Sequence, residues 1–382
     1  MIGKLMPNGN PVVLLYDPYP ISGGGGQIQS QLIRVLNLSL TSGSLRVLST
    51  ADCSHGFSLY WHRFRQALKY RRQIESVDLL VLQGHFDPGS VLLGRHALAH
   101  KVPYIVVSRG DYVPALNLFG VTQSPLRKWL MWILFGRQLL RNAAAVVVTS
   151  ELEKNRLQKV GASTNRFCVI PDPAPQSTTY RDSAVNEYND HQGQIPARPY
   201  ALWLGRIARE KGLELLLYCW LQVKNRCPGA QLVIAGSISH PEVYKWVIRM
   251  RRRLNLEDSI IIQNWVSGIE KSRLLAQARC LVLPSHFESL GLVVIEALAA
   301  RTPVVVSTGT PWQHIDGIGG RWLPHNPQLW AEVIAKYLCS PSKQEVPLGE
   351  AQKLLAPYNV NIVAGKWSHL ITDVINAQSR NS

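Results

Sequence analysis

The sequence lacks three patterns that would assign a metal, redox or membrane-spanning role at once. No Asp-x-Asp occurs in the 382 residues, although enzymes that hold a divalent cation against phosphate groups usually need closely spaced carboxylates as oxygen ligands. The six cysteines include no Cys-x-x-Cys and the eleven histidines are scattered, so no zinc motif is present. Apolar runs of about 18 residues, the length of a spanning helix, are also missing. We therefore predict no metal site and no integral membrane segment.

Cysteine usage and the start of the chain both favour a cytoplasmic location. Without a paired spacing pattern, we predict that all six cysteines are reduced and structural. Residues 1–20 lack a positively charged segment followed by an uninterrupted apolar core, which a secretory signal needs.

Acidic residues are scarce, with 25 Asp and Glu against 41 Lys and Arg, for a net charge of +16. Most of the excess lies in the first half of the chain, where residues 61–72 and 124–141 mix basic and aromatic side chains. Both segments resemble helices that lie on an anionic membrane surface. Alternatively, their apolar faces pack in the core and the cations are solvated. We predict peripheral attachment to the inner face of the membrane; a basic nucleic-acid-binding protein is the competing class.

Length and composition predict two domains, because 382 residues with 46% hydrophobic content can form two cores. The boundaries follow from residues 173–198, which are rich in Pro, Asn, Asp, Gln and Ser and read as a linker. Residues 1–172 and 199–357 each begin with an apolar strand and continue with alternating strands and helices, which predicts two doubly wound α/β domains. The expected strands are 11–16, 79–82, 104–107, 145–149, 200–204, 231–235, 259–262, 281–283 and 304–307. Residues 358–377 have helical spacing with an apolar stripe.

Residues 281–307 bring two carboxylates together in a strand, loop, helix and strand. Glu288 is predicted in the loop and Glu296 in the helix. In an open parallel sheet such a loop lies at the carboxyl ends of the strands, and the free N–H groups of the helix start favour an anion. The alternative is that Glu288 is a solvated charge and Glu296 a half-buried helix residue. We favour a phosphate site flanked by two hydroxyl-binding carboxylates.

A second cluster follows the predicted strand 200–204, where Arg206 and Lys211 stand in the sequence Gly-Arg-Ile-Ala-Arg-Glu-Lys-Gly. A departing diphosphate needs a metal or fixed cations to stabilise its charge. Arg offers a planar fork to phosphate oxygens and Lys a mobile point charge. The alternative is that Arg206 and Lys211 belong to a solvated helix start, where basic residues are common after a strand.

Together the two segments resemble the signature of retaining glycosyltransferases of family 4, a Glu and a second Glu eight positions on, ahead of Pro-Val-Val. The resemblance implies the GT-B fold: two Rossmann-like domains facing a central cleft, with a C-terminal helix, 358–382, crossing back to the first domain. It implies that Glu288 touches the transferred sugar, that Glu296 binds the ribose hydroxyls, and that Arg206 and Lys211 hold the diphosphate. Backbone N–H groups to sugar and phosphate are expected from Ser289, Leu290, Gly291 and Leu292.

Other expected site residues lie at strand ends. A glycine-rich stretch before the helical run 28–38 is read as a loop, and its spacing does not fit a dinucleotide-binding fingerprint. The resemblance implies that this loop faces the donor phosphates through Gly24, Gly25 and Gly26, that His85 is catalytic, and that Arg109 and Asp111 contact the acceptor. Backbone at Gly236 and Val266 is expected to read the base.

The resulting prediction is a metal-independent enzyme without a cofactor, which transfers a sugar with retention from a nucleotide-diphosphate sugar to a glycan or lipid-linked acceptor. Residues 309–315 are similar to a subgroup of bacterial polysaccharide enzymes, which suggests a role in cell-surface polysaccharide synthesis. An epimerase of the same fold is the closest alternative, because it would convert the donor without an acceptor. A membrane- or nucleic-acid-binding protein leaves Glu288 and Glu296 unexplained.

Overall fold

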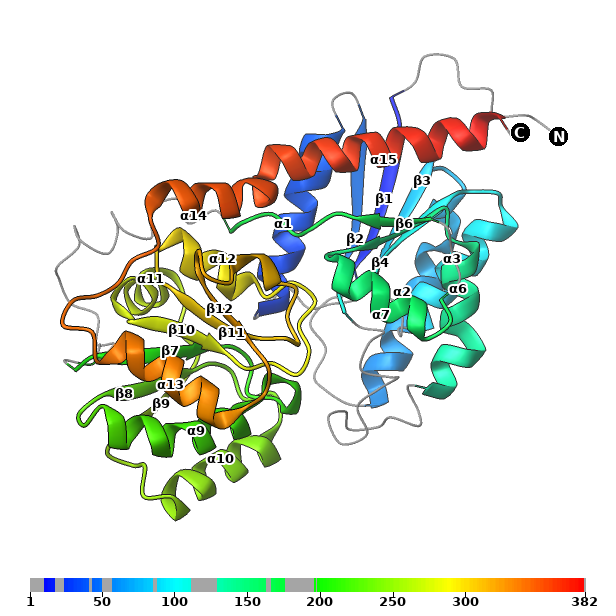
Figure 1. The fold of residues 1–382 in the computed structure, drawn as a ribbon. Helices are drawn as coiled ribbons and strands as arrows, with labels where there is room; N and C mark the ends of the chain where they lie inside the picture. The colour runs from blue at the N-terminus through cyan, green and yellow to red at the C-terminus, as the bar shows by residue number, and fades with distance from the viewer. Residues whose placement is uncertain are drawn as a thin grey trace. The chain divides into compact units, whose positions relative to one another are not determined.

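The chain forms two compact units, each with its own parallel sheet (Figure 1). The computed structural model describes residues 10–17, 24–40, 43–49, 57–84, 88–110, 129–162, 166–175, 196 and 198–380. The first unit comprises Met1–Pro173 and Tyr358–Ser382, and the second comprises Ala174–Pro357. Both sheets have six strands and helices on both faces. The predicted α/β fold with two doubly wound sheets is confirmed.

The sheet of the first unit has the strand order β2-β1-β3-β4-β5-β6, with every pair parallel. Its strands are β1 Val12–Asp17, β2 Ser44–Ser49, β3 Leu79–Gln83, β4 Tyr104–Val107, β5 Ala145–Val148 and β6 Phe167–Val169. Its helices are α1 Gly24–Ser39, α2 Phe57–Ile74, α3 Pro88–Ala99, η1 Trp132–Gly136, α6 Arg137–Asn142, α7 Glu151–Lys159 and α15 Val360–Arg380.

The strands of the first unit are apolar on both faces because helices cover both. In β1, Leu14 and Tyr16 point toward the core beneath α2, α3, α6 and α7. The alternate residues Val13 and Leu15 point toward α1 and α15. This arrangement explains why the strand reads as a continuous hydrophobic run rather than an alternating one.

The C-terminal helix α15 belongs to the first unit although the preceding chain belongs to the second. Val363, Trp367 and Ile371 are buried against the face that α1 also covers. A hydrogen bond from Ser39 Oγ to the Ala364 carbonyl, 3.0 Å long, ties the two helices together. The apolar stripe is therefore core contact, and the predicted return of the last helix to the first domain is confirmed.

The sheet of the second unit has the order β12-β11-β10-β7-β8-β9, again wholly parallel. Helices α9, α10 and α13 cover one face, and α11 and α12 cover the other (Figure 1). Its strands are β7 Tyr200–Leu204, β8 Gln231–Ala235, β9 Ile260–Gln263, β10 Cys280–Leu283, β11 Val304–Ser307 and β12 Gly320–Leu323. Its helices are η2 Arg209–Lys211, α9 Leu213–Arg226, α10 Pro241–Arg253, α11 Gly268–Gln277, α12 Leu292–Ala299, η3 Gln313–Ile315, α13 Pro327–Leu338 and α14 Leu348–Leu355, followed by η4 Ala356–Tyr358.

The prediction that every cysteine is reduced is wrong for two of them. Cys227 and Cys339, which are 112 positions apart in the sequence, form a disulfide with their Cα atoms 5.8 Å apart. Each follows the last residue of a helix, α9 and α13 respectively, and these helices pack on one face of the sheet. Sequence spacing carries no sign of this proximity. The state of the cysteines therefore no longer supports the predicted cytoplasmic location.

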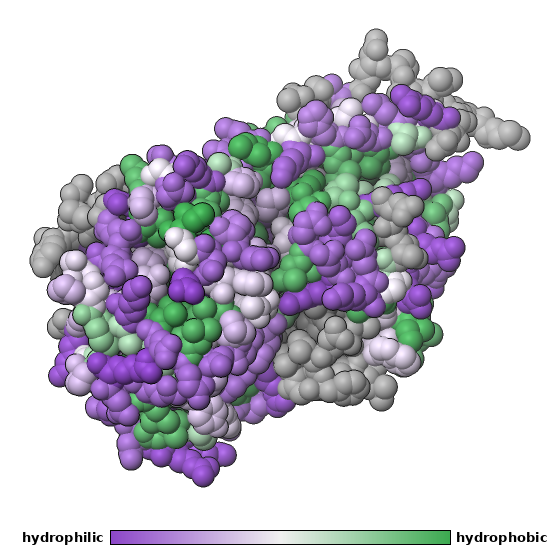
Figure 2. All heavy atoms as spheres, in the orientation of Figure 1, coloured by the Kyte–Doolittle hydropathy of each residue, from purple (hydrophilic) through white to green (hydrophobic). Residues whose placement is uncertain are grey.

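The visible face of the second unit in Figure 2 is mostly hydrophilic, with small hydrophobic patches among the polar side chains. Within the described part of the chain, no helix is both long and apolar enough to cross a membrane.

Candidate active site

The predicted donor residues of the second unit lie after its strands, and Lys211 and Glu288 meet where its sheet reverses its order. The chain builds β7, β8 and β9 in one direction and then returns to place β10 beside β7. Because all strands are parallel, the segments after β7 and β10 emerge at the same edge, side by side. In open α/β sheets, ligands bind at the carboxyl ends of the strands at this switch point.

Two glycines allow the segments at this edge to approach closely. Gly212 has φ of 65° and directly precedes α9, and a Cβ there would overlap the carbonyl oxygen of Pro284, just after β10. A Cβ at Gly236, which follows β8, would overlap the carbonyl oxygen of Gly205, which follows β7. Both positions require glycine for backbone contact. Gly236 therefore has a structural role whether or not a base is read beside it.

Lys211 and Glu288 form an ion pair at this edge. Lys211 Nζ lies 3.0 Å from Oε1 and 2.6 Å from Oε2 of Glu288. Each side chain is only 13% exposed. The Glu288 N–H donates to the carbonyl of Gly309, at 3.2 Å, which fixes the backbone that carries the carboxylate. The structure thus joins two residues that are 77 positions apart in the sequence.

Arg206 lies at the same edge but is more accessible. Its guanidinium contacts Glu210 at 3.2 Å, and its side chain is 57% exposed. An exposed pair of this kind contributes little to stability. The cation is therefore available to an anion from solvent without disruption of the fold.

Gly291 and Trp312 fix the conformation of the loop between β10 and α12. Gly291 has φ of 80° and precedes α12, so the helix starts with a sharp turn that a side chain would strain. The buried Trp312 donates from Nε1 to the carbonyl of Leu290, 2.5 Å away. Ser289, Leu290 and Gly291 come directly before the helix, and Leu292 is its first residue. The first N–H groups of a helix have no partner within it, so the start of α12 offers donors to an anion.

Glu296 is buried in α12 and pairs with a lysine that sequence reasoning missed. Its side chain is 4% exposed, and Lys271 Nζ, from α11, lies 2.5 Å from Oε1. Burial raises the pKa of Glu296, and the nearby ammonium of Lys271 partly offsets this effect. No motif marks Lys271, because its importance comes only from the packing of α11 beside α12.

A histidine cluster supports the same loop from the α9 side. His286 Nε2 is hydrogen-bonded to Glu214 in the first turn of α9. The ring of His286 stacks on that of His325, with 4.6 Å between centroids, and His325 Nε2 contacts the Pro284 carbonyl at 3.0 Å. The hydrogen bond to Glu214 raises the pKa of His286. Neither histidine was singled out in the sequence.

The two residues expected to read the base occupy neighbouring strand ends. Gly236 follows β8, and Val266 lies three residues after β9. The Gly236 N–H approaches the Gln263 carbonyl at 3.5 Å. Val266 is buried, so only its backbone is suited to contact a ligand.

In the first unit, the glycine stretch is not a loop as predicted. Gly24, Gly25 and Gly26 form the first turn of α1. Their N–H groups are the unpaired donors of a helix start, which keeps an anion-binding role open despite the changed structure. β1 and β3 are adjacent, and the order reverses between them. His85 and Asp111 lie outside the described residues.

Arg109 follows β4 and is engaged within the first unit. Its guanidinium lies 2.6 Å from Asp172, and its side chain is 11% exposed. Its φ of 46° is uncommon for a residue with a side chain. Acceptor contact by this guanidinium would require exchange of the Asp172 partner.

The backbone around Arg109 is anchored by a buried carboxylate in α7. Glu153 accepts a hydrogen bond from Ser108 Oγ at 2.7 Å and another from the Gly110 N–H. It also accepts from the backbone and hydroxyl of Thr149, each at 2.8 Å. Burial raises the pKa of Glu153, and these four donors oppose that shift. Sequence reasoning missed this residue, although Ser150 and Glu153 have the spacing of a helix start.

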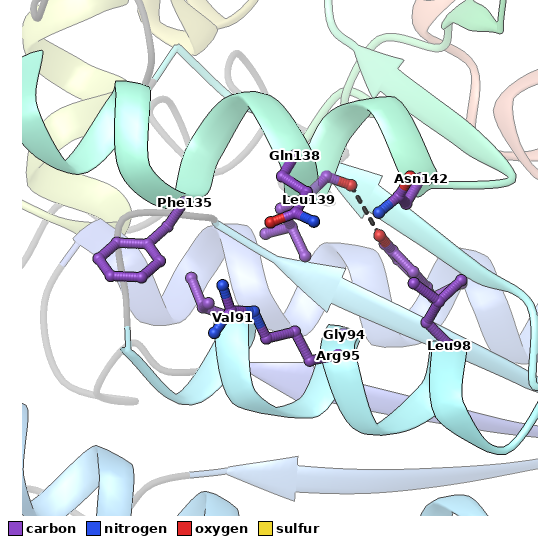
Figure 3. A pocket seen from close by; sticks show the side chains of 9 residues that line it. Val91, Gly94, Arg95, Leu98, Phe135, Gln138, Leu139 and Asn142 are labelled. Carbon is purple, nitrogen blue, oxygen red and sulfur yellow. Dashed lines mark hydrogen bonds between the residues drawn. The ribbon is translucent and has the colours of Figure 1, made fainter.

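A small cavity in the first unit lies away from these residues. It is enclosed by α3 and α6, and Figure 3 shows Val91 and Arg95 facing Phe135 and Leu139 across it. Its volume is about 30 Å³, which suits a water or two rather than a sugar.

Two family models match consecutive parts of the chain. "Glycosyl transferase 4-like domain" matches residues 10–173, and "Glycosyl transferases group 1" matches residues 186–354. The chain belongs to the glycosyltransferases. The resemblance stated from residues 201–212 and 281–307 is therefore confirmed at this level.

Individual relatives agree with this family. The glycosyltransferase is 27% identical over 214 residues to a D-inositol 3-phosphate glycosyltransferase of Segniliparus rotundus, covering 54% of this chain and 47% of that protein. It is 27% identical over 237 residues to the alpha-D-kanosaminyltransferase of Streptomyces kanamyceticus, covering 60% and 58%. The chain thus spans about half the length of the curated relatives that it matches.

Solved structures show the fold. Anabaena HepE in complex with UDP and glucose aligns with a TM-score of 0.71 at 16% identity, over 95% of this chain and 100% of that one. A sucrose-phosphate synthase from Thermosynechococcus elongatus aligns with a TM-score of 0.74 at 19% identity, over 96% and 100%. At these identities the likeness establishes the GT-B fold alone.

Proposed function

We propose that this glycosyltransferase moves a sugar, with retention, from a nucleotide-diphosphate sugar to a hydroxyl of a glycan or lipid-linked acceptor. The observation that carries the proposal is the meeting of Lys211 and Glu288 at the switch point of the second sheet. A cation and a carboxylate on adjacent strand ends, next to the start of α12, match the two ends of a sugar diphosphate. HepE is described in complex with UDP, which makes UDP the first nucleotide to test.

The reaction proposed is a front-side displacement. The bond between the anomeric carbon and the diphosphate oxygen breaks, and the acceptor oxygen bonds to the same carbon from the same face. The acceptor proton passes to the departing diphosphate. Arg206, Lys211 and the first N–H groups of α12 stabilise the negative charge that develops on that diphosphate.

Donor binding changes the partners of two ion pairs. Lys211 is held by Glu288 in the structure, so its ammonium must turn to the diphosphate, and Glu288 is then released toward the sugar hydroxyls. Glu296 is held by Lys271 and offers its second carboxylate oxygen to the ribose. The two ion pairs hold both carboxylates in position before the donor arrives.

The same site supports our proposal of metal-independent catalysis. Two cations, Arg206 and Lys211, and a helix start are grouped where a diphosphate would lie. Fixed cations of this kind can replace a divalent ion at a phosphate. No resident cofactor is proposed.

We further propose that the first unit rests on an anionic membrane surface, where a lipid-linked acceptor would lie. Four large apolar side chains in the helical segment 129–142 are 41–51% exposed, namely Trp129, Leu130, Ile133 and Leu134. The exposed Arg137 and Arg141 follow within two turns. Exposed apolar side chains beside cations suit the boundary between lipid tails and anionic headgroups. The net charge of +16 favours the same surface.

The donor assignment is tested by binding of UDP, GDP and ADP in EDTA, measured by calorimetry on the full chain, followed by the matching sugar nucleotides. Selective binding of one diphosphate by the wild type, lost in Lys211→Ala, is expected. Lys224→Ala is the matched control, because Lys224 pairs with Asp258 elsewhere on the second unit and is 33% exposed. Equal binding by wild type and Lys211→Ala would refute the site. Conversion of the sugar nucleotide without any acceptor would identify an epimerase instead.

Membrane attachment is tested separately by sedimentation with vesicles of zwitterionic lipid and of the same lipid with anionic lipid added. Binding to the anionic vesicles alone, weakened in Trp129→Ser/Leu130→Ser, is expected. A matched control is Leu348→Ser, which removes an apolar side chain 57% exposed on the second unit. Binding that is unchanged in the double variant would place the contact elsewhere.

A further inference from the structure

Three potential metal ligands converge on the first unit, away from the proposed donor residues. Glu75 directly follows the last residue of α2, His96 lies in the last turn of α3, and His100 directly follows α3. His96 Nε2 lies 3.3 Å, and His100 Nε2 3.7 Å, from Glu75 Oε1. All three ligand atoms lie within 4.8 Å of one another. Among the described residues, no other group of three or more His, Cys, Asp or Glu side chains comes together in this way.

From this cluster we infer that Glu75, His96 and His100 bind a transition-metal ion, with Zn²⁺ as the ion of choice. Zinc bonds to imidazole nitrogen and carboxylate oxygen are about 2.0–2.2 Å, and ligands at tetrahedral angles are then about 3.3–3.5 Å apart. The two distances to Glu75 Oε1 lie at or just above this spacing. Imidazole ligands favour zinc, copper and nickel over magnesium or calcium.

The helical spacing of His96 and His100 is a sequence signal that the prediction of no metal site did not take into account. Residues four apart on a helix lie on the same face, and His pairs at this spacing bind zinc in known motifs. The His100 N–H donates to the His96 carbonyl at 3.1 Å, so the helical hydrogen bonding continues through His100. The two rings are already adjacent, with centroids 4.3 Å apart.

The backbone beneath the three ligands is fixed before any ion binds. Ile74 and Val77, on either side of Glu75 in the chain, are buried in the core, as is Ala97 next to His96. After His100 the helix ends with Lys101 at a φ of 56°, and the Val102 N–H donates to the Ala97 carbonyl at 2.8 Å. Gln378 of α15 donates to the Lys101 carbonyl, also at 2.8 Å. A site on a rigid scaffold loses little entropy when the ion binds.

The site is open to solvent and would join two helices. The His96, His100 and Glu75 side chains are 20%, 42% and 47% exposed, which gives an ion an entry path and leaves the fourth position to water. Glu75 precedes β3, and His100 precedes β4, so both lie at the amino-terminal edge of the sheet. The predicted sugar-binding residues follow the carboxyl ends of strands. The bound ion therefore clamps the end of α2 to the end of α3 and takes no part in sugar transfer.

The test is a calorimetric titration of the full chain with Zn²⁺ alone, after removal of any affinity tag and of bound metal with a chelator. One ion per chain is expected in the wild type. His96→Ala and His100→Ala should each lower the Zn²⁺ affinity by about 10- to 100-fold or more. Loss of an outer-shell partner alone causes a drop of that size. His369→Ala is the matched control, because His369 is an exposed histidine on α15 in the same unit, and its affinity should equal that of the wild type.

Two further measurements separate a built site from loose surface binding. Co²⁺ should give the intense visible absorption of a four-coordinate ion in the wild type and lose it in His96→Ala. Added Zn²⁺ should raise the Tm of the wild type but not that of His96→Ala, provided that both have the same Tm without metal. Zinc affinity that is unchanged in both His96→Ala and His100→Ala, or a wild type that binds none, would overturn the inference. UDP binding is unaffected in either case, so the outcome is independent of the proposed transfer reaction.

Discussion

Lys211 Nζ lies 2.6 Å from Oε2 of Glu288, so the two residues proposed to bind opposite ends of the donor bind each other in the ligand-free structure. The carboxylate competes with the diphosphate for the ammonium. Donor binding therefore includes the rupture of a pair in which each side chain is 13% exposed.

This competition predicts opposite effects on binding for the two partners. Lys211→Ala should weaken UDP binding by at least about tenfold, because a charge-assisted contact with phosphate is worth about 1.5–3 kcal/mol. Glu288→Gln should bind UDP as well as the wild type or better, because Lys211 is then free, yet it should transfer sugar far more slowly. Calorimetry and a transfer assay measure the two effects. Glu257→Gln, a carboxylate 56% exposed on the same unit, is the control, and weaker UDP binding by Glu288→Gln would disprove the competition.

The pair of Glu296 and Lys271 predicts a large loss of stability on single substitution. Lys271→Met leaves a carboxylate that is 4% exposed without its cation, which costs about 3–5 kcal/mol. Lys271→Met/Glu296→Gln removes both charges and should recover most of that loss. Urea unfolding of the four proteins in the cycle measures the coupling. Additive losses would show that the two side chains do not stabilise each other.

The His286 and Glu214 pair predicts a pH-dependent contribution to stability. The hydrogen bond to Glu214 raises the pKa of His286 above its usual 6.5, so the stabilisation is complete below that value and is lost as the pH rises through the folded-state pKa. Burial alone would raise the pKa of Glu214, but the hydrogen bond from His286 lowers it below 4.5, so its contribution is lost only in acid. Burial lowers the pKa of the stacked His325. Its contribution to stability therefore has the opposite pH dependence and is lost as the pH falls through its folded-state pKa.

The measurement is the difference in unfolding free energy between wild type and His286→Gln at pH 6 and pH 9. The difference should be larger at pH 6 than at pH 9, because the stabilisation is lost as the pH rises through the folded-state pKa of His286. His240→Gln, a histidine that precedes α10 in the same unit, controls for a general effect of pH. A difference that is constant with pH would mean that the pair is not charged.

The disulfide predicts a loss of stability on reduction. A bridge between residues 112 positions apart constrains the unfolded chain by about 4–5 kcal/mol in the loop-entropy model. Cys339→Ser and reduced wild type should therefore unfold at similar, lower urea concentrations than oxidised wild type. Cys219→Ser, which changes a free buried cysteine, should show the same response to reductant as the wild type. No change on reduction would mean that the bridge does not form in solution.

The four hydrogen bonds to Glu153 predict that its replacement loosens the loop that carries Arg109. Glu153→Gln puts an amide donor where the carboxylate accepts hydrogen bonds, so at least one buried N–H loses its partner, at a cost of about 1–3 kcal/mol. Hydrogen exchange of Gly110 and Thr149 should accelerate. Glu151→Gln, in the same helix turn and 64% exposed, should change neither stability nor exchange. Unaltered protection of Gly110 in Glu153→Gln would show that the carboxylate does not anchor the loop.

Much of the fold follows from hydrophobic runs that the sequence displays. β3, β7, β8, β10 and β11 lie within one or two residues of their predicted bounds, because strands buried on both faces read as continuous apolar segments. The strands β2, β6 and β12 were not predicted. All three lie at sheet edges. β6 has only three residues, and β2 and β12 contain exposed or polar positions such as Arg46 and Arg321, so their apolar signal is weak.

Some residues of the candidate site could be predicted from the sequence, and others could not. Glu288, Glu296, Arg206 and Lys211 were predicted from local spacing and from the family resemblance, because each lies in a short motif that follows a strand. Lys271, Glu153 and Trp312 were missed. Each acts through a partner that is distant along the chain or packed on another element, and no local pattern marks such a residue.

The sequence by itself determined most of the strands and the α/β class, and it marked the residues proposed to bind a sugar diphosphate, because apolar periodicity and loop motifs are local properties. Only the tertiary structure decided which charges meet. It paired Lys211 with Glu288 and Lys271 with Glu296, bonded Cys227 to Cys339, and turned the predicted glycine loop into the first turn of α1. Contacts of this kind depend on strand order and helix packing, which bring residues 25 to 112 positions apart within bonding distance.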